Sequence, residues 1–267
     1  MGVKVSFLLE RGTPPRMNPI LAEACARLEA RGIQVALRFP EHELTRVDML
    51  RVDSDLYVLK SNTSLAFTLA TVLDRLGGPL LNCYEACLAT RDKVLAAATL
   101  AAASIPAPRS LVAGQPGQFA ARLAAGPLIV KPYRGAYGRG VTVADRPAAL
   151  PAADEHPEFA FAQDYLHPAR TDLKVFGIGD EVFGVRKTFG ADSFLHTGEP
   201  AALSPEVESI VRRVAEAFGL ELFGVDVAED ERGAYVFDVN SFPGFRGVPD
   251  APGRLAAYIE RRARDHA

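Results

Sequence analysis

The chain has 267 residues, of which 48% are hydrophobic and 24% charged, an ordinary balance for a globular protein that buries a sizeable core. Its formal net charge is −3, and the charged residues are interspersed, which excludes a basic nucleic-acid-binding stripe and an acidic disordered tail. Cys25, Cys83 and Cys87 are too few for a disulfide framework, which indicates a reducing compartment, and we interpret Cys83 and Cys87 as small core residues.

The sequence carries no segment that we expect to cross or enter a membrane. The apolar run near the N-terminus is short, and the Ala-rich stretch 94–108 contains proline. We therefore predict a cytoplasmic protein with no membrane contact and no nucleic-acid partner.

The first 91 residues alternate short apolar runs with helical patterns. Strands are predicted at 3–9, 34–39, 55–60 and 80–82, and helices at 19–31 and 64–76. Asn18 is suited to cap the first helix, and Gly32 is suited to end it. This alternation predicts a small parallel sheet flanked by helices.

The pattern changes after residue 91. A helix over 92–104 is broken by Pro106 and Pro108, and a second amphipathic helix covers 205–218, with a last one starting near Asp250. Short alternating runs predict antiparallel strands at 128–133, 140–144, 159–165, 173–178, 182–189, 223–228 and 235–240. The predicted fold is therefore α/β followed by α+β, with an N-terminal parallel domain at 1–91, a central domain at 92–165 and a C-terminal domain at 166–267.

A glycine-rich turn follows the predicted strand that ends near Lys131. Gly135, Gly138 and Gly140 lie within six residues, where glycine allows backbone N–H groups to approach an anion closely. The turn lies between two strands, unlike a P-loop, which precedes a helix. It predicts a lid over phosphates, and an ordinary hairpin turn is the alternative.

Three oxygen-bearing side chains gather in the last predicted hairpin. Asp238 and Asn240 are two residues apart on one strand, so they share a face, and Asp226 lies on the partner strand. Two carboxylates and an amide oxygen suit Mg²⁺. Acids among such apolar runs are costly without a cation, so the hairpin predicts a metal site, with turn-capping carboxylates as the alternative.

Taken in order along the chain, six short segments resemble the ATP-grasp superfamily. They are residues 90–93, 105–108, 130–132, 162–166, 172–176 and 237–244. The resemblance covers about 81–247 and implies an ATP-grasp fold, in which two mostly antiparallel subdomains clasp ATP behind a small parallel N-terminal domain. It departs from the family pattern at Ser104, where the family has Gly.

The resemblance also implies cofactors and roles for individual residues. The cofactors are ATP and one or two Mg²⁺ ions, for which Mn²⁺ can substitute. The implied ATP-binding residues are Lys93 and Lys131 on the phosphates, with the glycine turn over them, the backbone of Gln163, Asp164 and Tyr165 on adenine, and Asp172 on the ribose. Asp226, Asp238 and Asn240 hold the metal.

Three cations are candidates for the transferred phosphoryl group. Arg186 and Lys187 lie on one predicted strand and Lys174 on the strand before it. The alternative for the first two is a solvated strand edge, where cations are common.

Two branches of the superfamily fit. The chain resembles the ribosomal-protein-S6 and lysine-biosynthesis carboxylate–amine ligases, which implies an ADP-forming ligase with an acyl-phosphate intermediate, a small-molecule or peptide acceptor, and a homo-oligomer. Asp238 stands where these ligases have Glu, and Lys174 where they have Arg, which resembles the inositol-phosphate kinases. Cations for a polyphosphate are few, so we prefer the ligase over the kinase. A nucleotide-binding protein without catalysis is the third alternative, but no phosphate lysine or metal ligand is missing.

Overall fold

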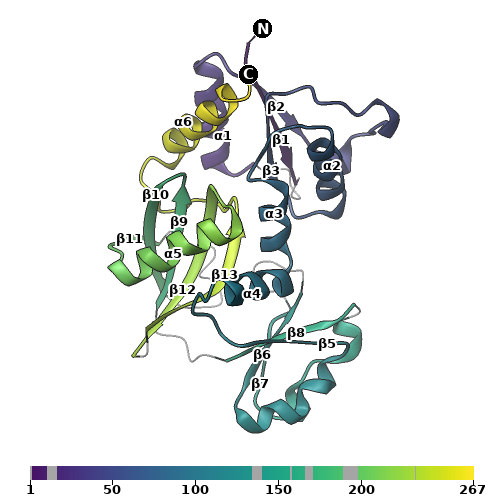
Figure 1. Ribbon diagram of the computed structural model, residues 1–267, viewed down its shortest axis with the longest axis vertical. Helices are drawn as coiled ribbons and strands as arrows, with labels where there is room; N and C mark the ends of the chain where they lie inside the picture. The colour runs from purple at the N-terminus through teal and green to yellow at the C-terminus, as the bar shows by residue number, and fades with distance from the viewer. Residues whose placement is uncertain are drawn as a thin grey trace.

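Three sheets follow one another along the long axis of this computed structural model (Figure 1). The structure describes residues 2–10, 17–133, 140–156, 158–165, 171–188, 198–231 and 233–267. Sheet A has the strand order β2-β1-β3-β4, sheet B the order β5-β8-β6-β7, and sheet C the order β11-β10-β9-β12-β13. The predicted class, a parallel sheet followed by two antiparallel ones, is confirmed.

Sheet A is parallel throughout and is formed by the first part of the chain. Its strands are β1 (Lys4–Leu9), β2 (Gln34–Arg38), β3 (Leu56–Lys60) and β4 (Leu80–Leu81). The helices of this part are α1 (Pro19–Ala30) and α2 (Ser64–Arg75). Their starts are fixed by side-chain caps, because Asn18 accepts the N–H of Ile20 and Thr63 accepts that of Ala66.

Sheets B and C are antiparallel and lie below sheet A in Figure 1. Sheet B contains β5 (Ser110–Ala113), β6 (Leu128–Pro132), β7 (Thr142–Ala144) and β8 (Ala160–Asp164). Sheet C contains β9 (Thr171–Ile178), β10 (Glu181–Thr188), β11 (Glu199–Ala201), β12 (Leu222–Asp230) and β13 (Gly233–Ser241). Its two faces bury different cores. Val175 and Val225 pack with α5 (Pro205–Phe218) on one face, whereas Phe176 on the other face packs with sheet A.

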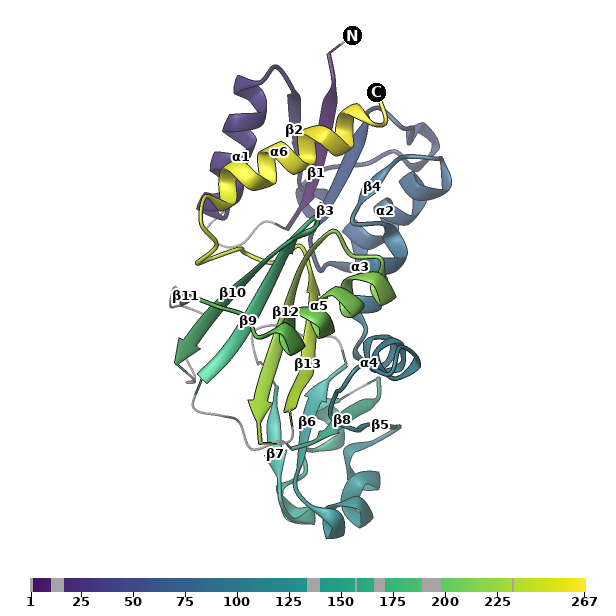
Figure 2. The ribbon, with the colours of Figure 1, turned by 60° about the vertical axis from the view of Figure 1, so that its left-hand side comes forward.

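The last helix, α6 (Ala251–Arg264), returns to the first domain and lies beside α1 (Figure 2). Leu255 and Ile259 of α6 are buried in one core with Phe7 of β1 and Phe176 of β9. This core joins the ends of sheets A and C, so the carboxyl edge of sheet A is held against the site-bearing face of sheet C. The predicted division at residues 91 and 165 stays a prediction.

One α-helix and two strands were not predicted, namely α3 (Tyr84–Arg91), β5 and β11, and neither was the 3-10 helix η3 (Pro116–Ala125). α3 precedes α4 (Lys93–Ala102), whose first turn is capped by the carboxylate of Asp92. The interpretation of Cys83 as a core residue is wrong, because it is exposed at the start of α3, whereas Cys87 is buried as expected. Within the described ranges, none of the helices has the length and apolar character needed to traverse a bilayer.

Asp53 ties three strands together at the amino edge of sheet A. It accepts hydrogen bonds from the Tyr57 hydroxyl at 2.8 Å and the Lys4 ammonium at 3.2 Å, and it pairs with Arg38 at 2.6 Å. Burial raises the pKa of Asp53, but the hydrogen bonds from Tyr57 and Lys4 and the charges of Arg38 and Lys4 outweigh it and lower the pKa from 3.8 to about 2.

Asp53→Asn is expected to destabilise the fold at neutral pH. The unfolded carboxyl has the higher pKa, so its ionised form stabilises the native state above pH 3.8, and this contribution is lost as pH falls towards about 2. Because the side chain is 34% exposed, solvent screening reduces the effect to about 1 kcal/mol. Urea unfolding at several pH values measures it. A difference between wild type and variant that did not shrink with falling pH would contradict this account.

Candidate active site

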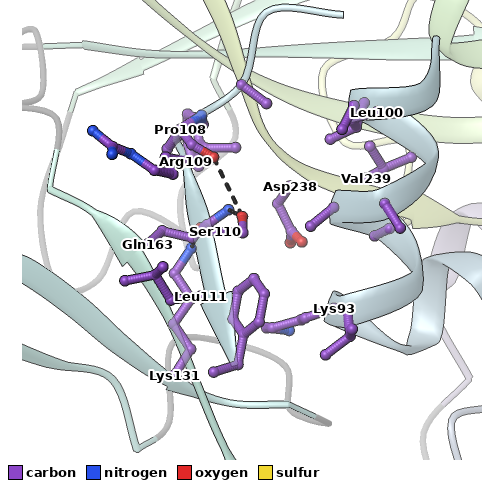
Figure 3. A pocket seen from close by; sticks show the side chains of 18 of the residues that line it. Lys93, Leu100, Pro108, Arg109, Ser110, Leu111, Lys131, Gln163, Asp238 and Val239 are labelled. Atoms are coloured by element: carbon purple, nitrogen blue, oxygen red, sulfur yellow. Dashed lines mark hydrogen bonds between the residues drawn. The ribbon is translucent and has the colours of Figure 1, made fainter. Parts of the chain in front are cut away.

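A cavity of about 450 Å³ lies between α4, sheet B and β13. Ala97, Leu100 and Ala101 of α4 give it an apolar wall. Figure 3 shows Asp238 pointing into the cavity from β13, with Lys93 and Lys131 on two other sides. The cavity therefore combines an apolar wall with a small set of converging charges, as ligand sites commonly do.

The sheet B wall is organised by a chain of hydrogen bonds. The Lys131 ammonium donates to Gln163 Oε1 at 2.7 Å, and Gln163 Nε2 donates to Ser110 Oγ at 3.2 Å. β6, β8 and β5 are neighbours in the sheet, so these side chains line one face. These two hydrogen bonds fix the position of the Lys131 ammonium. Ser110 was not predicted, and the only signal for it is the strand-like run after Pro108.

The charges of four predicted residues act on one another. Burial lowers the pKa of Lys131, the carboxylates of Asp238 and Asp226 raise it, and the ammonium of Lys93 lowers it further. Like charges held this close favour an anionic ligand between them. The structure thus brings together the two predicted phosphate lysines and the two predicted metal carboxylates.

The three predicted metal ligands lie on one face of the β12–β13 hairpin. Asp226 is directly opposite Asp238, and Asn240 is opposite Gly224. The Asn240 amide donates to Asp238 Oδ2 at 3.2 Å. Lys174 of β9 is opposite Asp226 on the other side, and its ammonium pairs with Asp226 Oδ1 at 2.8 Å. Lys174 therefore belongs to the same constellation.

This donor set fits a magnesium ion. Two carboxylates and an amide supply hard oxygen ligands, and Mg²⁺ completes its shell with water and phosphate oxygens. The ammonium of Lys174 on Asp226 shows that the position attracts positive charge. In the portion of the chain that the structure describes, no group of three or more His, Cys, Asp or Glu side chains could hold a metal. The amide of Asn240 is therefore needed to complete a three-ligand set.

Asp164 and Tyr165 lie at the end of β8, where adenine was predicted to meet the backbone. The Asp164 carboxylate lies between Arg122 at 2.6 Å and Arg109 at 3.2 Å. The N–H of Asp164 donates to the carbonyl of Arg109, and that of Tyr165 donates to Pro127. Both of these N–H groups are therefore already engaged within the protein. Gln163 contributes its side chain to the cavity, whereas its backbone was predicted to act.

The remaining predicted residues have different outcomes. Gly140 has a φ of 69°, and a Cβ there would lie 2.8 Å from Pro132 Cγ, so the end of the turn requires glycine. Gly135 and Gly138 lie outside the described residues. Asp172 and Lys187 are paired in the β9–β10 register, and their side chains lie outside the described part.

Arg186 lies on the other face of sheet C, a position that does not favour its predicted catalytic role, which stays a prediction. In β10 its neighbour Val185 is opposite Lys174 and shares the face of the site, and consecutive strand residues face opposite ways. Arg186 pairs with Glu229 Oε2 at 3.1 Å instead. Its alternative interpretation, a cation on a solvated strand, is the one that this position supports.

Arg186→Gln is therefore expected to leave catalysis nearly unchanged. The guanidinium and its partner Glu229 are 40% and 36% exposed, and such pairs contribute about 0–1 kcal/mol to stability. We expect kcat and KM within about twofold of wild type, since surface substitutions away from a site rarely do more. Steady-state ADP release measures both. A large loss of kcat with an intact fold would return Arg186 to the reaction.

Curated ligases resemble this chain over most of its length. A protein of Xanthomonas campestris pv. campestris strain 8004, named "probable alpha-L-glutamate ligase", is 31% identical over 212 residues, which are 72% of this chain and 73% of that protein. A protein of the same name from Photobacterium profundum is 28% identical over 253 residues, which are 86% and 82% of the two chains.

Solved structures share the fold across nearly the whole chain. A RimK domain ATP-grasp protein from Sphaerobacter thermophilus DSM 20745 has a TM-score of 0.74 at 17% identity, with 97% of this chain and 100% of that chain covered. D-cycloserine synthetase DcsG also has a TM-score of 0.74 at 17% identity, with 97% and 99% covered. The ATP-grasp ligase PsnB, complexed with a minimal precursor, has a TM-score of 0.70 at 20% identity, with 98% and 99% covered.

The family is shown by a model described as "RimK-like ATP-grasp domain", which matches residues 90–258. This range holds the cavity and every predicted site residue. The named relatives are ligases, so neither the kinase nor the non-catalytic alternative is favoured. The predicted resemblance to the ATP-grasp carboxylate–amine ligases is confirmed, and the chain belongs to the RimK-like ATP-grasp family.

Proposed function

We propose that this chain, an ATP-dependent carboxylate–amine ligase, works through an acyl phosphate. A carboxylate oxygen of the substrate attacks the γ-phosphorus of ATP, and ADP leaves. The amine nitrogen then attacks the acyl carbon, the bond from carbon to the phosphate oxygen breaks, and the amide, inorganic phosphate and a proton are released. The observation that carries this proposal is the convergence of Lys93, Lys131 and Asp238 at one cavity, with Asp226 directly opposite Asp238 in the hairpin.

The cavity is the proposed ATP site. The purine lies against its apolar wall near Gln163–Tyr165, and the phosphates extend towards Lys93 and Lys131. Two ammonium groups on different elements provide point charges for a polyphosphate. Asp172 would contact the ribose, and Lys187 would contact the transferred phosphoryl group. Lys174 now pairs with Asp226, and it would be free to contact that group as well if a metal ion took its place on the carboxylate.

Asp226, Asp238 and Asn240 would hold one or two Mg²⁺ ions, and Mn²⁺, which prefers the same oxygen donors, can substitute. A bound divalent ion polarises phosphoryl oxygens and offsets the charge that develops during transfer. The protein's own contribution is the fixed geometry of the hairpin, in which Asp226 and Asp238 are directly opposite each other.

The amine substrate is proposed to be an amino acid, with L-glutamate as the first candidate. Two relatives carry the name alpha-L-glutamate ligase, and one structural neighbour was solved with a precursor peptide. The acyl donor is accordingly a small carboxylic acid or the carboxyl group of a peptide. A homo-oligomer and a cytoplasmic location stay predictions.

Phosphorus NMR of the purified protein with ATP and Mg²⁺ tests the reaction class. The acceptors are pools of amino acids, small carboxylic acids and peptides, with inositol and sugar phosphates in a parallel sample. We expect ADP and inorganic phosphate only when a carboxylate and an amine are both present. A new phosphoester resonance in the parallel sample would overturn the ligase proposal.

A further inference from the structure

Lys60 is a charged residue that the site described above does not use. It is the last residue of β3, at the carboxyl edge of the parallel sheet A. In open α/β sheets ligands bind at this edge, because loops and helix starts converge there. The edge faces the end of β13, and the Lys60 ammonium lies 5.9 Å from the ring centroid of Phe242.

Lys60 is partly buried at the end of β3. Burial lowers the pKa of Lys60, and the charge of Glu10 raises it. The Glu10 carboxylate itself accepts the N–H of Asn62 at 3.3 Å. Among the residues that the structure describes, Lys60 makes neither a hydrogen bond nor an ion pair. Lys60 is only partly buried, and a partly desolvated ammonium that makes no hydrogen bond to the described residues is suited to donate one to a ligand.

Phe242 connects Lys60 to the metal hairpin. It follows Asn240 by two residues, a distance of at most about 7 Å for extended chain. Phe242 and Phe245 have positive φ angles of 44° and 52° and are buried, a strained geometry that is typical of functional loops. The turn holds the ring beside Lys60, so the chain runs from the Lys60 contact directly into the strand that carries Asp238 and Asn240.

We propose that Lys60 binds the free carboxylate of the amine substrate. The inference rests on the proposed ligase function and adds that the amine substrate is an amino acid recognised by its own charge. With the carboxylate on Lys60, the amino group of the same molecule is directed towards the acyl phosphate at Asp226 and Asp238. Lys60 is thus a specificity-determining residue that belongs to the first domain.

The test compares L-glutamate with its two monoamides, L-glutamine and L-isoglutamine, in wild type and Lys60→Met. A charge-assisted hydrogen bond contributes about 1.5–3 kcal/mol, so the variant is expected to raise KM for L-glutamate about 10- to 100-fold. The KM for ATP should stay unchanged. Wild type should discriminate against one monoamide by a similar factor, and Lys60→Met should lose that discrimination.

Two further variants separate recognition from folding. Lys60→Arg keeps the charge and should restore most of the affinity, while Lys4→Met removes a lysine from the opposite edge of sheet A and should leave KM unchanged. Lys60→Met should melt close to wild type, because the ammonium that it removes is partly exposed and makes no hydrogen bond or ion pair with the described residues. Absence of ADP release by wild type with every amine would refute the proposed function. Active wild type with an unchanged KM for L-glutamate in Lys60→Met would refute this inference alone.

Discussion

Asp238→Asn is expected to reduce kcat about 100- to 1,000-fold, the range found when one group that stabilises transition-state charge is removed. The carboxylate lies opposite Asp226 and points into the cavity, so it would help to hold a divalent ion there (Figure 3). An amide of the same size can still accept the hydrogen bond from Asn240, which Asp238 now accepts at 3.2 Å. The fold should therefore remain, and single-turnover ADP formation measures the loss.

The matched control for Asp238→Asn is Glu229→Gln. Glu229 is an acid of the neighbouring strand β12, but it pairs with Arg186 on the other face of sheet C. Its substitution should change kcat by less than about twofold. Two results together would contradict the metal role. They are equal losses of activity in Asp238→Asn and Glu229→Gln, and no recovery of activity or ATP affinity in Asp238→Asn at raised Mg²⁺. The Asp238 carboxylate would then have a structural role instead.

The β12–β13 hairpin and its cluster of oxygen-bearing side chains could be predicted from the sequence because the information is local. A spacing of two residues puts Asp238 and Asn240 on one face of any strand, and a short turn fixes the partner strand. The pairing of Asp226 with Asp238 follows from that turn. A β-bulge between Asp226 and Val227 shifts the register beyond this pair, and no residue pattern indicates it.

The face of Arg186 could not be predicted in the same way. Arg186 and Lys187 are consecutive, so a strand must direct them to opposite faces, but the sequence does not say which face carries the site. The answer comes from tertiary packing. Val185 is buried in the core shared with sheet A, whereas Leu173, opposite Arg186, is buried beneath α5. Val185 and Leu173 are both apolar, so their hydrophobicity alone cannot show which of the two cores each one joins.

Short elements were missed for a related reason. β5 has four residues, and α3 has eight and a mixed polar composition, so neither shows enough periodicity to be recognised. The consequence for the site was the loss of Ser110, which supports Gln163 and through it Lys131. The same omission explains Cys83, whose exposure depends on where α3 starts.

Lys131→Met is expected to weaken ATP binding about 10- to 100-fold, the cost of one charge-assisted hydrogen bond. Methionine keeps the length of the side chain and removes the ammonium that donates to Gln163 at 2.7 Å. Calorimetric titration with a non-hydrolysable ATP analogue and Mg²⁺ measures the affinity, with Lys4→Met as the control for loss of a lysine elsewhere. Equal affinities in all three proteins would remove Lys131 from the phosphate site.

The pH dependence of this binding links Lys131 to Asp238. Because burial holds the pKa of Lys131 below its ordinary value of 10.5, wild-type affinity should fall as alkaline pH neutralises the ammonium, and Lys131→Met should lose this dependence. The carboxylate of Asp238 raises the pKa of Lys131, so Asp238→Asn should move the fall in affinity to lower pH. Glu229→Gln should leave it in place. A shift in Asp238→Asn but not in Glu229→Gln would show that the charge of Asp238 acts directly on Lys131, whereas the loss of an acid elsewhere does not.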